Sequence, residues 1–221
     1  MKTEVKVILP FKTEGEFFVE KLGEIEKKPV YNVAKRLFDI VFSFKGLIVL
    51  IIPIYIIAII IKCSSKGSVF YSQERLGLNG KKIKVIKFRS MHSNAEEFGA
   101  RWSDGDDDER IFPFGKVLRK FRLDELPQLW CILKGDMSIV GPRPERECFY
   151  DAFETYIHGF SERLKVMPGL TGHAQINGGY DLKPEEKILY DVEYIKKRSL
   201  WFDLKIIFKT ILVVFTHEGA N

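Results

Sequence analysis

The sequence predicts an α+β protein of the monotopic membrane type, which is held on one face of a bilayer. A re-entrant broken helix is expected first, followed by a small globular domain with a short hairpin and interfacial amphipathic helices. Three observations predict this class: a long apolar segment with a proline near its middle, two alternating stretches joined by an Asn-Gly turn, and an apolar carboxyl-terminal segment interrupted by charges. With 46% hydrophobic and 29% charged residues among 221, the composition excludes a disordered chain and a multi-span transporter.

The charge balance and the cysteines narrow the class of protein further. Lys and Arg total 35 and Asp and Glu total 30, so the net charge is +5. This mildly basic balance suits an anionic phospholipid membrane, but it is far from that of a nucleic-acid-binding tail, so no nucleic-acid partner is expected. The three cysteines form no Cys-x-x-Cys pair, which argues against a disulfide scaffold or a zinc site.

The chain divides into three predicted parts. Residues 1–30 form an amino-terminal extension with six lysines and six glutamates, whose role the sequence does not indicate. Within it, residues 5–9 alternate and predict a short strand. Residues 31–66 hold the apolar membrane segment with its flanks. Residues 67–221 form the globular domain, which ends in an interfacial helix.

The apolar segment Leu37–Ile61 predicts a helix that enters the membrane. As one helix it would be about 37 Å long, enough for the ~30 Å hydrocarbon core. Pro53 argues against a continuous helix, because it lacks an N–H and its ring clashes with the carbonyl of Val49. Asp39 and Lys45 would each cost roughly 3 kcal/mol at the bilayer centre. A spanning helix with a kink at Pro53 remains the alternative.

The charges on both sides of this segment favour a re-entrant topology. Lys35 and Arg36 precede it and Lys62 follows it, and such positive flanks prefer the cytoplasmic side. A helix that turns back at Ile52-Pro53 keeps both flanks on that side. The predicted topology therefore depends on Lys35, Arg36, Ile52 and Pro53.

The globular part mixes strand and helix signals. Strands are expected over 69–73 and 82–89, joined by a turn at Asn79-Gly80. The remaining elements are helices over 116–130 as far as Pro127, 145–163 and 183–197, shaped loops over 135–146 and 167–172, and an acidic loop over 101–110. The last segment, 200–215, predicts either an interfacial helix with Trp201 at the headgroup level or a core helix of the domain.

Two adjacent carboxylates, Asp124 and Glu125, follow the cations Arg119, Lys120 and Arg122. Arginines beside a carboxylate lower its pKa and keep it ionised, and they also form a site for a phosphate. An ionised carboxylate next to phosphate binders is what aspartyl-phosphate chemistry requires, and the second carboxylate could hold Mg²⁺. The alternative is an aspartate at a helix start in a solvated ion pair.

Two further basic features could bind phosphate. In Pro142-Arg143-Pro144 the prolines lock the backbone, so that the guanidinium is fixed and could clamp a diphosphate. The basic stripe over 81–89, which includes Lys87 and Arg89, alternates, so its cations are expected on one strand face toward lipid headgroups or substrate phosphates. The alternatives are a Pro-rich turn with a surface arginine and a solvated strand face.

These motifs together resemble the bacterial sugar transferase family, the monotopic phosphoglycosyl transferases. The resemblance covers residues 31–221. It rests on an ordered set: Lys35-Arg36-x-Phe38-Asp39 before the apolar segment, Gln73-Glu74-Arg75-x-Gly77-x-Asn79-Gly80, Lys87-Phe88-Arg89-Ser90-Met91, Leu123-Asp124-Glu125-Leu126-Pro127-Gln128, Lys134-Gly135-Asp136-Met137-Ser138, Gly141-Pro142-Arg143-Pro144, Pro168-Gly169-Leu170-Thr171-Gly172 and Asp203-Leu204-Lys205-Ile206-Ile207.

The resemblance implies a membrane enzyme that moves a sugar-1-phosphate from a UDP-sugar to undecaprenyl phosphate and releases UMP. In such a member Asp124 is the nucleophile that forms a phosphosugar-aspartyl intermediate, and Glu125 is the Mg²⁺ ligand. Arg119 and Arg143 neutralise phosphate charge, and Pro142–Pro144 shape the nucleotide or phosphate pocket. The implied place is the cytoplasmic face of the bacterial inner membrane.

The implied pathway is the start of exopolysaccharide, capsule, O-antigen or glycoprotein glycan assembly. UDP-glucose and UDP-galactose are the first candidate donors by analogy, and a homodimer is compatible with the resemblance. Ile52 departs from the family, in which many members have Ser before the helix-breaking proline, and Met167 stands where a basic residue is frequent.

Two other classes of function remain open at this stage. One is a catalytically inactive membrane scaffold that recruits glycan-assembly enzymes, against which the intact Asp124-Glu125 pair argues. The other is a basic peripheral protein that only binds anionic lipid or nucleic acid. Binding that depends strongly on salt, without any catalysis, would identify this class.

Overall fold

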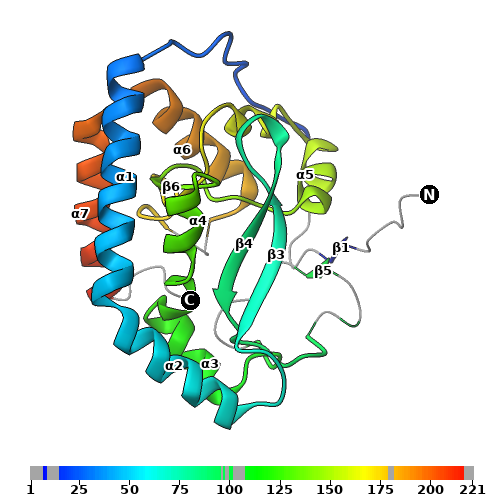
Figure 1. The fold of residues 1–221 in the computed structure, drawn as a ribbon. Coiled ribbons are helices and arrows are strands. Elements are labelled where there is room, and N and C mark those ends of the chain that lie inside the picture. Colours follow the sequence, from blue (N-terminus) through cyan, green and yellow to red (C-terminus); the bar gives the residue numbers. More distant parts are fainter. Residues whose placement is uncertain are drawn as a thin grey trace.

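The computed structural model describes residues 7–8, 15–95, 97, 100–101, 108–178 and 182–216. Two long helices, α1 (Pro29–Val49) and α7 (Leu200–Thr216), lie side by side at one edge, and α2 (Ile51–Ser64) bends away from the end of α1 (Figure 1). The rest is a small domain of short helices and two-stranded sheets. The α+β class is therefore confirmed.

The bent pair α1–α2 is the element that the sequence predicts as a broken helix. α1 ends at Val49, whose carbonyl would accept from residue 53 in a continuous helix, and Pro53 has no N–H to donate. The helix resumes with the Ile54 N–H donating to the Leu50 carbonyl at 2.8 Å, and the two helices are bent by 61°. The break thus lies at Leu50. The expected turn at Ile52-Pro53 is wrong in position, because proline acts on the carbonyl four residues earlier.

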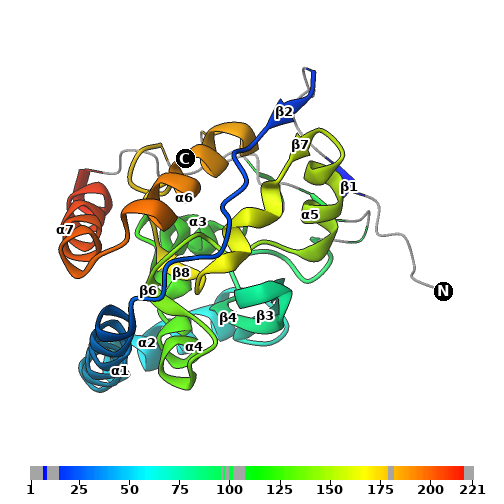
Figure 2. The same cartoon turned by 90° about the horizontal axis from the view of Figure 1, so that it is seen from above.

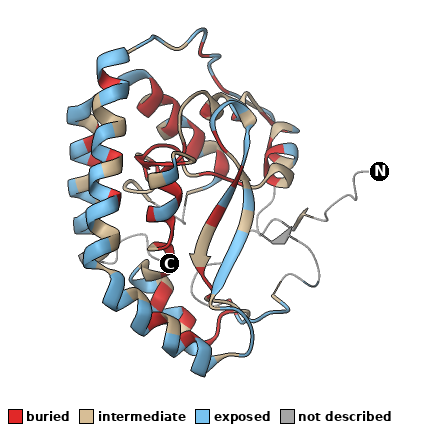
Figure 3. Cartoon of the chain, viewed as in Figure 1, coloured by how far each residue is buried: buried red, intermediate tan, exposed pale blue. Residues whose placement is uncertain are grey.

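By length and composition, no single helix in the described part of the chain could cross a membrane, whereas the bent pair passes the same test when its two helices are taken together. Both helices are exposed along their outer sides (Figure 3). The exposed large apolar side chains there include Val33, Leu37, Val41, Phe44, Ile48, Ile52, Tyr55, Ile56 and Ile59. An apolar surface of this kind is typical of a protein or membrane contact.

The inner side of α1 is fixed to the globular domain by polar contacts. Asp39 is buried, and its Oδ1 accepts from the Ile139 N–H at 2.9 Å. Arg36 donates to the carbonyls of Ile132 and Leu133 at 2.6 and 2.8 Å, at the carboxyl end of α4 (Gln128–Lys134). The charge of Asp39 therefore faces the protein, and the lipid penalty that the sequence suggested does not arise at this position.

Helix α7 is held against α1 by a buried carboxylate. Asp203 accepts from Lys35 at 2.8 Å, from the Tyr31 hydroxyl at 3.0 Å and from the Tyr194 hydroxyl at 2.9 Å. The opposite face of α7 is apolar and exposed at Leu204, Phe208, Ile211 and Leu212. The helix thus lies beside α1 and α6, as the core-helix alternative expects (Figure 2). It also presents the apolar side chains that an interfacial helix needs.

The predicted hairpin is confirmed. β3 (Phe70–Leu76) pairs antiparallel with β4 (Lys82–Phe88), and in the connecting turn Asn79 and Gly80 have φ of 54° and 75°. The expectation that the cations of β4 share one face is wrong. Lys82 and Lys84 are exposed, whereas Lys87 is partly buried and turns toward the interior. Lys82 and Lys84 stand an odd number of residues from Lys87, and successive side chains of a strand point to opposite faces, so Lys87 lies on the other face of β4.

The segment expected as one helix over 116–130 is divided into three elements. These are α3 (Pro113–Lys120), the 3₁₀ turn η3 (Leu123–Glu125) and α4. Arg122 separates the first two with φ of 53°, a left-handed conformation that interrupts a helix. The chain therefore changes direction just before Asp124.

The helix expected over 145–163 is divided too, into α5 (Glu147–Glu154), β7 (Ile157–His158) and the 3₁₀ helix η4 (Phe160–Lys165). Gly159, with φ of 100°, permits the turn between β7 and η4. The expected helix over 183–197 is confirmed as α6 (Pro184–Lys197), with its proline in the first turn.

The two loops predicted from Gly and Pro lie against each other. β6 (Ser138–Val140) pairs parallel with β8 (Gly169–Thr171), and the Gly141 N–H donates to the Thr171 carbonyl at 2.9 Å. A Cβ on Gly141 would lie 2.2 Å from the Met167 carbonyl oxygen, so only glycine allows this backbone approach.

The described residues of the amino-terminal extension pack on the domain. β2 (Phe17–Phe18) pairs with β7, and Val19 and Leu22 are buried in the main core. Of the strand predicted at 5–9, the structure describes β1 (Val7–Ile8), which pairs with β5 (Ala100–Arg101). Most of the predicted acidic loop over 101–110 lies outside the described residues.

Candidate active site

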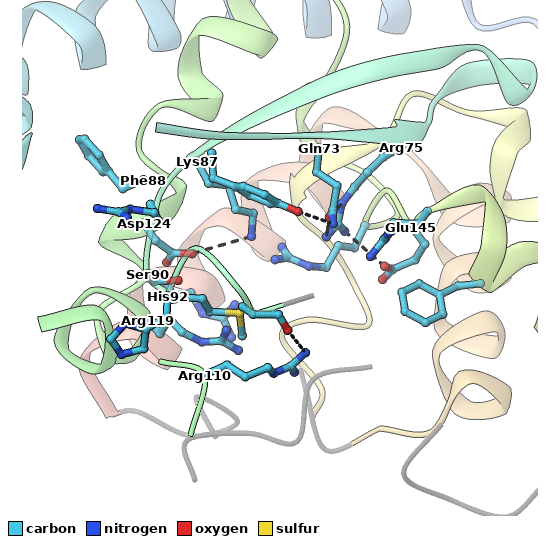
Figure 4. A pocket seen from close by; sticks show the side chains of 18 of the residues that line it. Gln73, Arg75, Lys87, Phe88, Ser90, His92, Arg110, Arg119, Asp124 and Glu145 are labelled. Carbon is cyan, nitrogen blue, oxygen red and sulfur yellow. Dashed lines mark hydrogen bonds and ion pairs between the residues drawn. The ribbon is translucent and has the colours of Figure 1, made fainter. Parts of the chain in front are cut away.

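A cavity of about 540 Å³ lies between the hairpin, α3, η3 and the loop after β6 (Figure 4). Its described lining has only two carboxylates, Asp124 and Glu145, but ten cationic residues. These are Arg75, Lys87, Arg89, Arg110, Arg119, Arg122, Arg143, Arg146, Arg163 and Lys187. An excess of this size in a concave site favours a ligand with several negative charges, such as a diphosphate.

Asp124 and Glu125 are brought to this cavity by the 3₁₀ turn η3. Both residues are buried, at 7% and 5% exposure. The left-handed Arg122 lets the Glu125 N–H donate back to the Arg122 carbonyl at 3.2 Å, which closes the turn. Asp124 lines the cavity, and Glu125 is not among the lining residues.

Glu125 is held by two cations. Its Oε1 accepts from Lys87 Nζ at 2.8 Å and from Arg143 Nη2, and its Oε2 lies 3.5 Å from Arg143 Nη1. Burial opposes ionisation of Glu125, but Arg143 and Lys87 outweigh it and hold its pKa well below the ordinary value. Glu125 is therefore ionised at neutral pH.

Asp124 is in a different electrostatic position. Lys87 Nζ lies 3.8 Å from its Oδ2, and Figure 4 shows the lysine reaching from the hairpin toward it. Burial raises the pKa of Asp124 above its ordinary value, and Glu125 adds to the rise, while Lys87, Arg119 and Arg143 oppose it. Arg119 and Arg143 do lower the pKa of Asp124, as expected, but desolvation is the larger effect, so the net shift is upward.

Arg143 connects the loop after β6 to the carboxylates. It lines the cavity with its guanidinium on Glu125. Pro142 and Pro144 are buried and do not line the cavity, but their carbonyls accept from the Gly169 N–H at 2.9 Å and from Arg75 Nη1 at 2.5 Å. The two prolines thus shape the site indirectly, by fixing the backbone that carries Arg143.

The whole pattern has a match among known proteins. Residues 30–217 match the family described as bacterial sugar transferase. The chain belongs to this family. The family that the sequence motifs predict is therefore confirmed.

Individual relatives differ in length from this family member. The chain is 41% identical over 209 residues to the UDP-N-acetylgalactosamine-undecaprenyl-phosphate N-acetylgalactosaminephosphotransferase of Aeromonas hydrophila, covering 91% of the chain and 48% of that protein. It is 43% identical over 193 residues to the UDP-glucose:undecaprenyl-phosphate glucose-1-phosphate transferase of Klebsiella pneumoniae, covering 85% and 41%. It is 36% identical to the exopolysaccharide production protein ExoY of Sinorhizobium fredii, covering 94% and 96%. The chain thus spans about half the length of the first two relatives and nearly all of the third.

The predicted phosphate binders of this sugar transferase separate into two groups. Lys87, Arg119 and Arg143 line the cavity near the carboxylates. Arg89 also lines it, but its guanidinium donates to the carbonyls of Lys66 and Ser65, the latter at 2.8 Å, just after α2. Arg89 therefore connects the cavity to the segment that follows the bent helix pair.

Five of the lining cations were not indicated as site residues by the sequence. These are Arg75, Arg110, Arg146, Arg163 and Lys187. Arg122 belongs to the cation run that the sequence indicates as a phosphate site, and Arg75 stands within a quoted motif, whose position could have indicated it. The other four come from separate elements, and only the tertiary fold brings them together.

The donor set is compatible with Mg²⁺. No group of three His, Cys, Asp or Glu side chains that could hold a metal occurs among the residues that the structure describes. Mg²⁺ commonly uses only one or two carboxylates and takes its other ligands from substrate phosphates and water, so the adjacent Asp124 and Glu125 fit it. Lys87 and Arg143 now contact Glu125, and metal binding there would require them to turn toward the substrate.

Proposed function

We propose that the chain transfers a sugar-1-phosphate from a UDP-sugar to undecaprenyl phosphate and releases UMP, as a first step in polysaccharide assembly. The observation that carries this proposal is Asp124, a carboxylate facing a cationic cavity in a bacterial sugar transferase. The names of the relatives support the substrates, since they include N-acetylgalactosamine-phosphate and glucose-1-phosphate transferases for undecaprenyl phosphate.

The transfer takes place in two displacement steps at one phosphorus atom. An oxygen of ionised Asp124 attacks the sugar-linked β-phosphorus, and the bond from this phosphorus to the bridging oxygen breaks, so that UMP leaves with the electron pair. A phosphate oxygen of undecaprenyl phosphate then attacks the same phosphorus and releases Asp124. Arg119, Arg143 and Lys87 lie where they neutralise the phosphate charges in both steps.

Glu125 has a supporting role in this scheme. Its ion pairs keep Lys87 and Arg143 together beside Asp124, and if it held Mg²⁺ these two cations would turn to the substrate phosphates. Mg²⁺ held at Glu125 would screen the repulsion between the diphosphate and the carboxylate nucleophile.

The place of the reaction is the cytoplasmic face of the inner membrane, with α1–α2 as a re-entrant pair. Two contacts at opposite ends of the pair support it. Arg36 near the start of α1 binds the carbonyl of Ile132, and Ser65 after α2 accepts from Arg89. Both ends thus contact the same globular domain. A spanning helix would place its ends on opposite sides of the bilayer and would break one of these contacts.

The experiment is UMP release by detergent-solubilised protein with undecaprenyl phosphate, Mg²⁺ and separate UDP-glucose, UDP-galactose and UDP-N-acetylgalactosamine. At least one donor should give UMP. Asp124→Asn should abolish release, because an amide cannot act as the nucleophile. Asp136→Asn, a carboxylate change outside the cavity lining, is the matched control and should keep activity.

Intact-protein mass spectrometry tests the covalent step. Wild-type protein incubated with the active donor and no acceptor should gain the mass of one sugar phosphate. The same adduct on Asp124→Asn would overturn the nucleophile assignment. Donor binding without any UMP release, in the wild-type protein, would instead favour the inactive membrane scaffold.

A further inference from the structure

Arg163 on η4 makes a buried ion pair beneath the loop that carries Arg143. Arg163 and Asp191 on α6 are 3% and 1% exposed, and Arg163 Nη2 lies 2.8 Å from Asp191 Oδ2. The same Nη2 donates to the Arg143 carbonyl at 2.9 Å. The guanidinium also lies 4.9 Å from the centre of the Phe160 ring, which restricts its position further.

The loop around Arg143 has no helix or strand to fix it, yet three successive carbonyls are bonded. The Pro142 carbonyl accepts from Gly169 at 2.9 Å, the Arg143 carbonyl accepts from Arg163, and the Pro144 carbonyl accepts from Arg75 at 2.5 Å. The two arginines come from η4 and β3, far from the loop in sequence. They therefore set the position of the loop relative to the rest of the cavity.

Stability alone does not account for this arrangement. Replacing a buried ion pair by apolar side chains of similar size is often neutral or stabilising, because burial of two charges is costly. Nε and Nη1 of Arg163 have no hydrogen-bond partner in the described structure, which adds to that cost. The stability of the fold therefore does not explain the Arg163–Asp191 pair, whereas a role in positioning Arg143 does.

We propose that Arg163, oriented by Asp191, is a positioning residue that holds Arg143 in place to bind Glu125 and the substrate phosphates. The inference rests on the proposed function, in which Arg143 neutralises phosphate charge. A misplacement of about 1 Å at such a group can cost on the order of 100-fold in rate. Arg163 acts through the Arg143 backbone.

The test separates positioning from folding by removing both charges together. Arg163→Met alone leaves Asp191 buried without a partner and is expected to unfold readily. The double variant Arg163→Met/Asp191→Leu removes this problem and should melt close to the wild-type temperature. We expect its kcat for UMP release to fall on the order of 100-fold, with a smaller change in KM. Lys165→Met, also on η4 but directed at Leu22, is the control and should stay near wild-type activity.

A double-mutant cycle with Arg143→Ala gives the decisive readout. If Arg163 acts through Arg143, the Arg163→Met/Asp191→Leu change should alter kcat less than about 3-fold when Arg143 is already Ala. A full additional loss in that background would overturn the proposal, and so would wild-type kcat in the folded double variant.

Calorimetric titration with UDP repeats the cycle without turnover. The double variant should bind UDP about 10-fold more weakly than the wild type, and the difference should vanish in the Arg143→Ala background. If wild-type protein releases no UMP from any donor, the proposed function fails, while this titration still decides the positioning role. Equal UDP affinity in the folded double variant and the wild type would overturn it.

Discussion

Replacing Lys87 by Met should make the activity more sensitive to acid. Lys87 Nζ lies 3.8 Å from the Asp124 carboxylate and is the charge that most favours its ionised form, while burial raises the pKa of that carboxyl. Because the nucleophile must be ionised, its protonation sets the acidic side of the pH profile. Loss of Lys87 removes a charge that favours the ionised form, so the acidic limb of kcat/KM should move to higher pH.

The size of the effect follows from the distance. Two unit charges at about 4 Å interact by about 4 kcal/mol at an effective dielectric constant of about 20. Arg119 and Arg143 also act on Asp124, and water screens a cavity that is open to substrate, so we take about a third of this figure. The remaining ~1.4 kcal/mol is a tenfold change in the ratio of ionised to protonated Asp124.

The assay is kcat/KM for UMP release across pH, with the wild type, Lys87→Met and the control Lys84→Met. Lys84 lies on the same strand but is exposed, so its variant should keep the wild-type profile. Below the limb, Lys87→Met should lose about tenfold more activity than on the alkaline plateau. An equal loss at every pH would refute the reasoning, because Lys87 would then act only on the substrate.

Three other outcomes are expected. Excess EDTA should abolish UMP release and Mg²⁺ should restore it, if Glu125 holds a metal. Asp203→Asn should lower the free energy of unfolding by about 3 kcal/mol, measured by melting in detergent, because Lys35 and two tyrosine hydroxyls lose a buried carboxylate. Pro53→Leu restores the N–H that the Val49 carbonyl lacks, so part of the population should span the membrane and expose a cysteine placed at Lys28 to an impermeant thiol reagent on intact cells.

Each of these outcomes has a contradicting result. Full activity in EDTA would remove the metal role of Glu125. Melting of Asp203→Asn at the temperature of Lys205→Gln, an exposed change on the same helix, would mean that the carboxylate contributes little. Strong labelling of the Lys28 cysteine with Pro53 intact, in a variant without native cysteines, while a cysteine placed at Gly219 stays protected, would mean that the helix spans.

Local chemistry accounts for the features that the sequence predicted well. Pro53 interrupts its helix through one missing donor and one clash, and Asn79-Gly80 supplies the left-handed residues that a tight hairpin needs. Pro184 begins α6 because its N–H would be unpaired in a first turn in any case. Each of these effects involves only a few neighbouring residues, so no knowledge of the fold is required.

Features that depend on tertiary contacts were not predictable in the same way. Arg122 is left-handed without being glycine, so no propensity indicates that the predicted helix stops there. The pKa of Asp124 depends mainly on its burial, whereas the sequence shows only the cations near it and not how deeply the carboxyl is buried. Arg163 reaches the site only because η4 packs beneath the loop after β6, and it would look like a surface arginine in the sequence.

The apolar segment carried more information than its hydrophobicity. Tyr31, Lys35, Asp39 and Ser43 recur every four residues and therefore lie on one face of α1, as i, i+4 neighbours do. All four face the domain: Tyr31, Asp39 and Ser43 are buried, and Lys35 pairs with Asp203 at 2.8 Å. In a helix surrounded by lipid, such a row of polar side chains would be unfavourable. The polar side of α1 packs on the globular domain and its exposed sides are mainly apolar, which supports the proposal that this helix lies between the domain and a membrane.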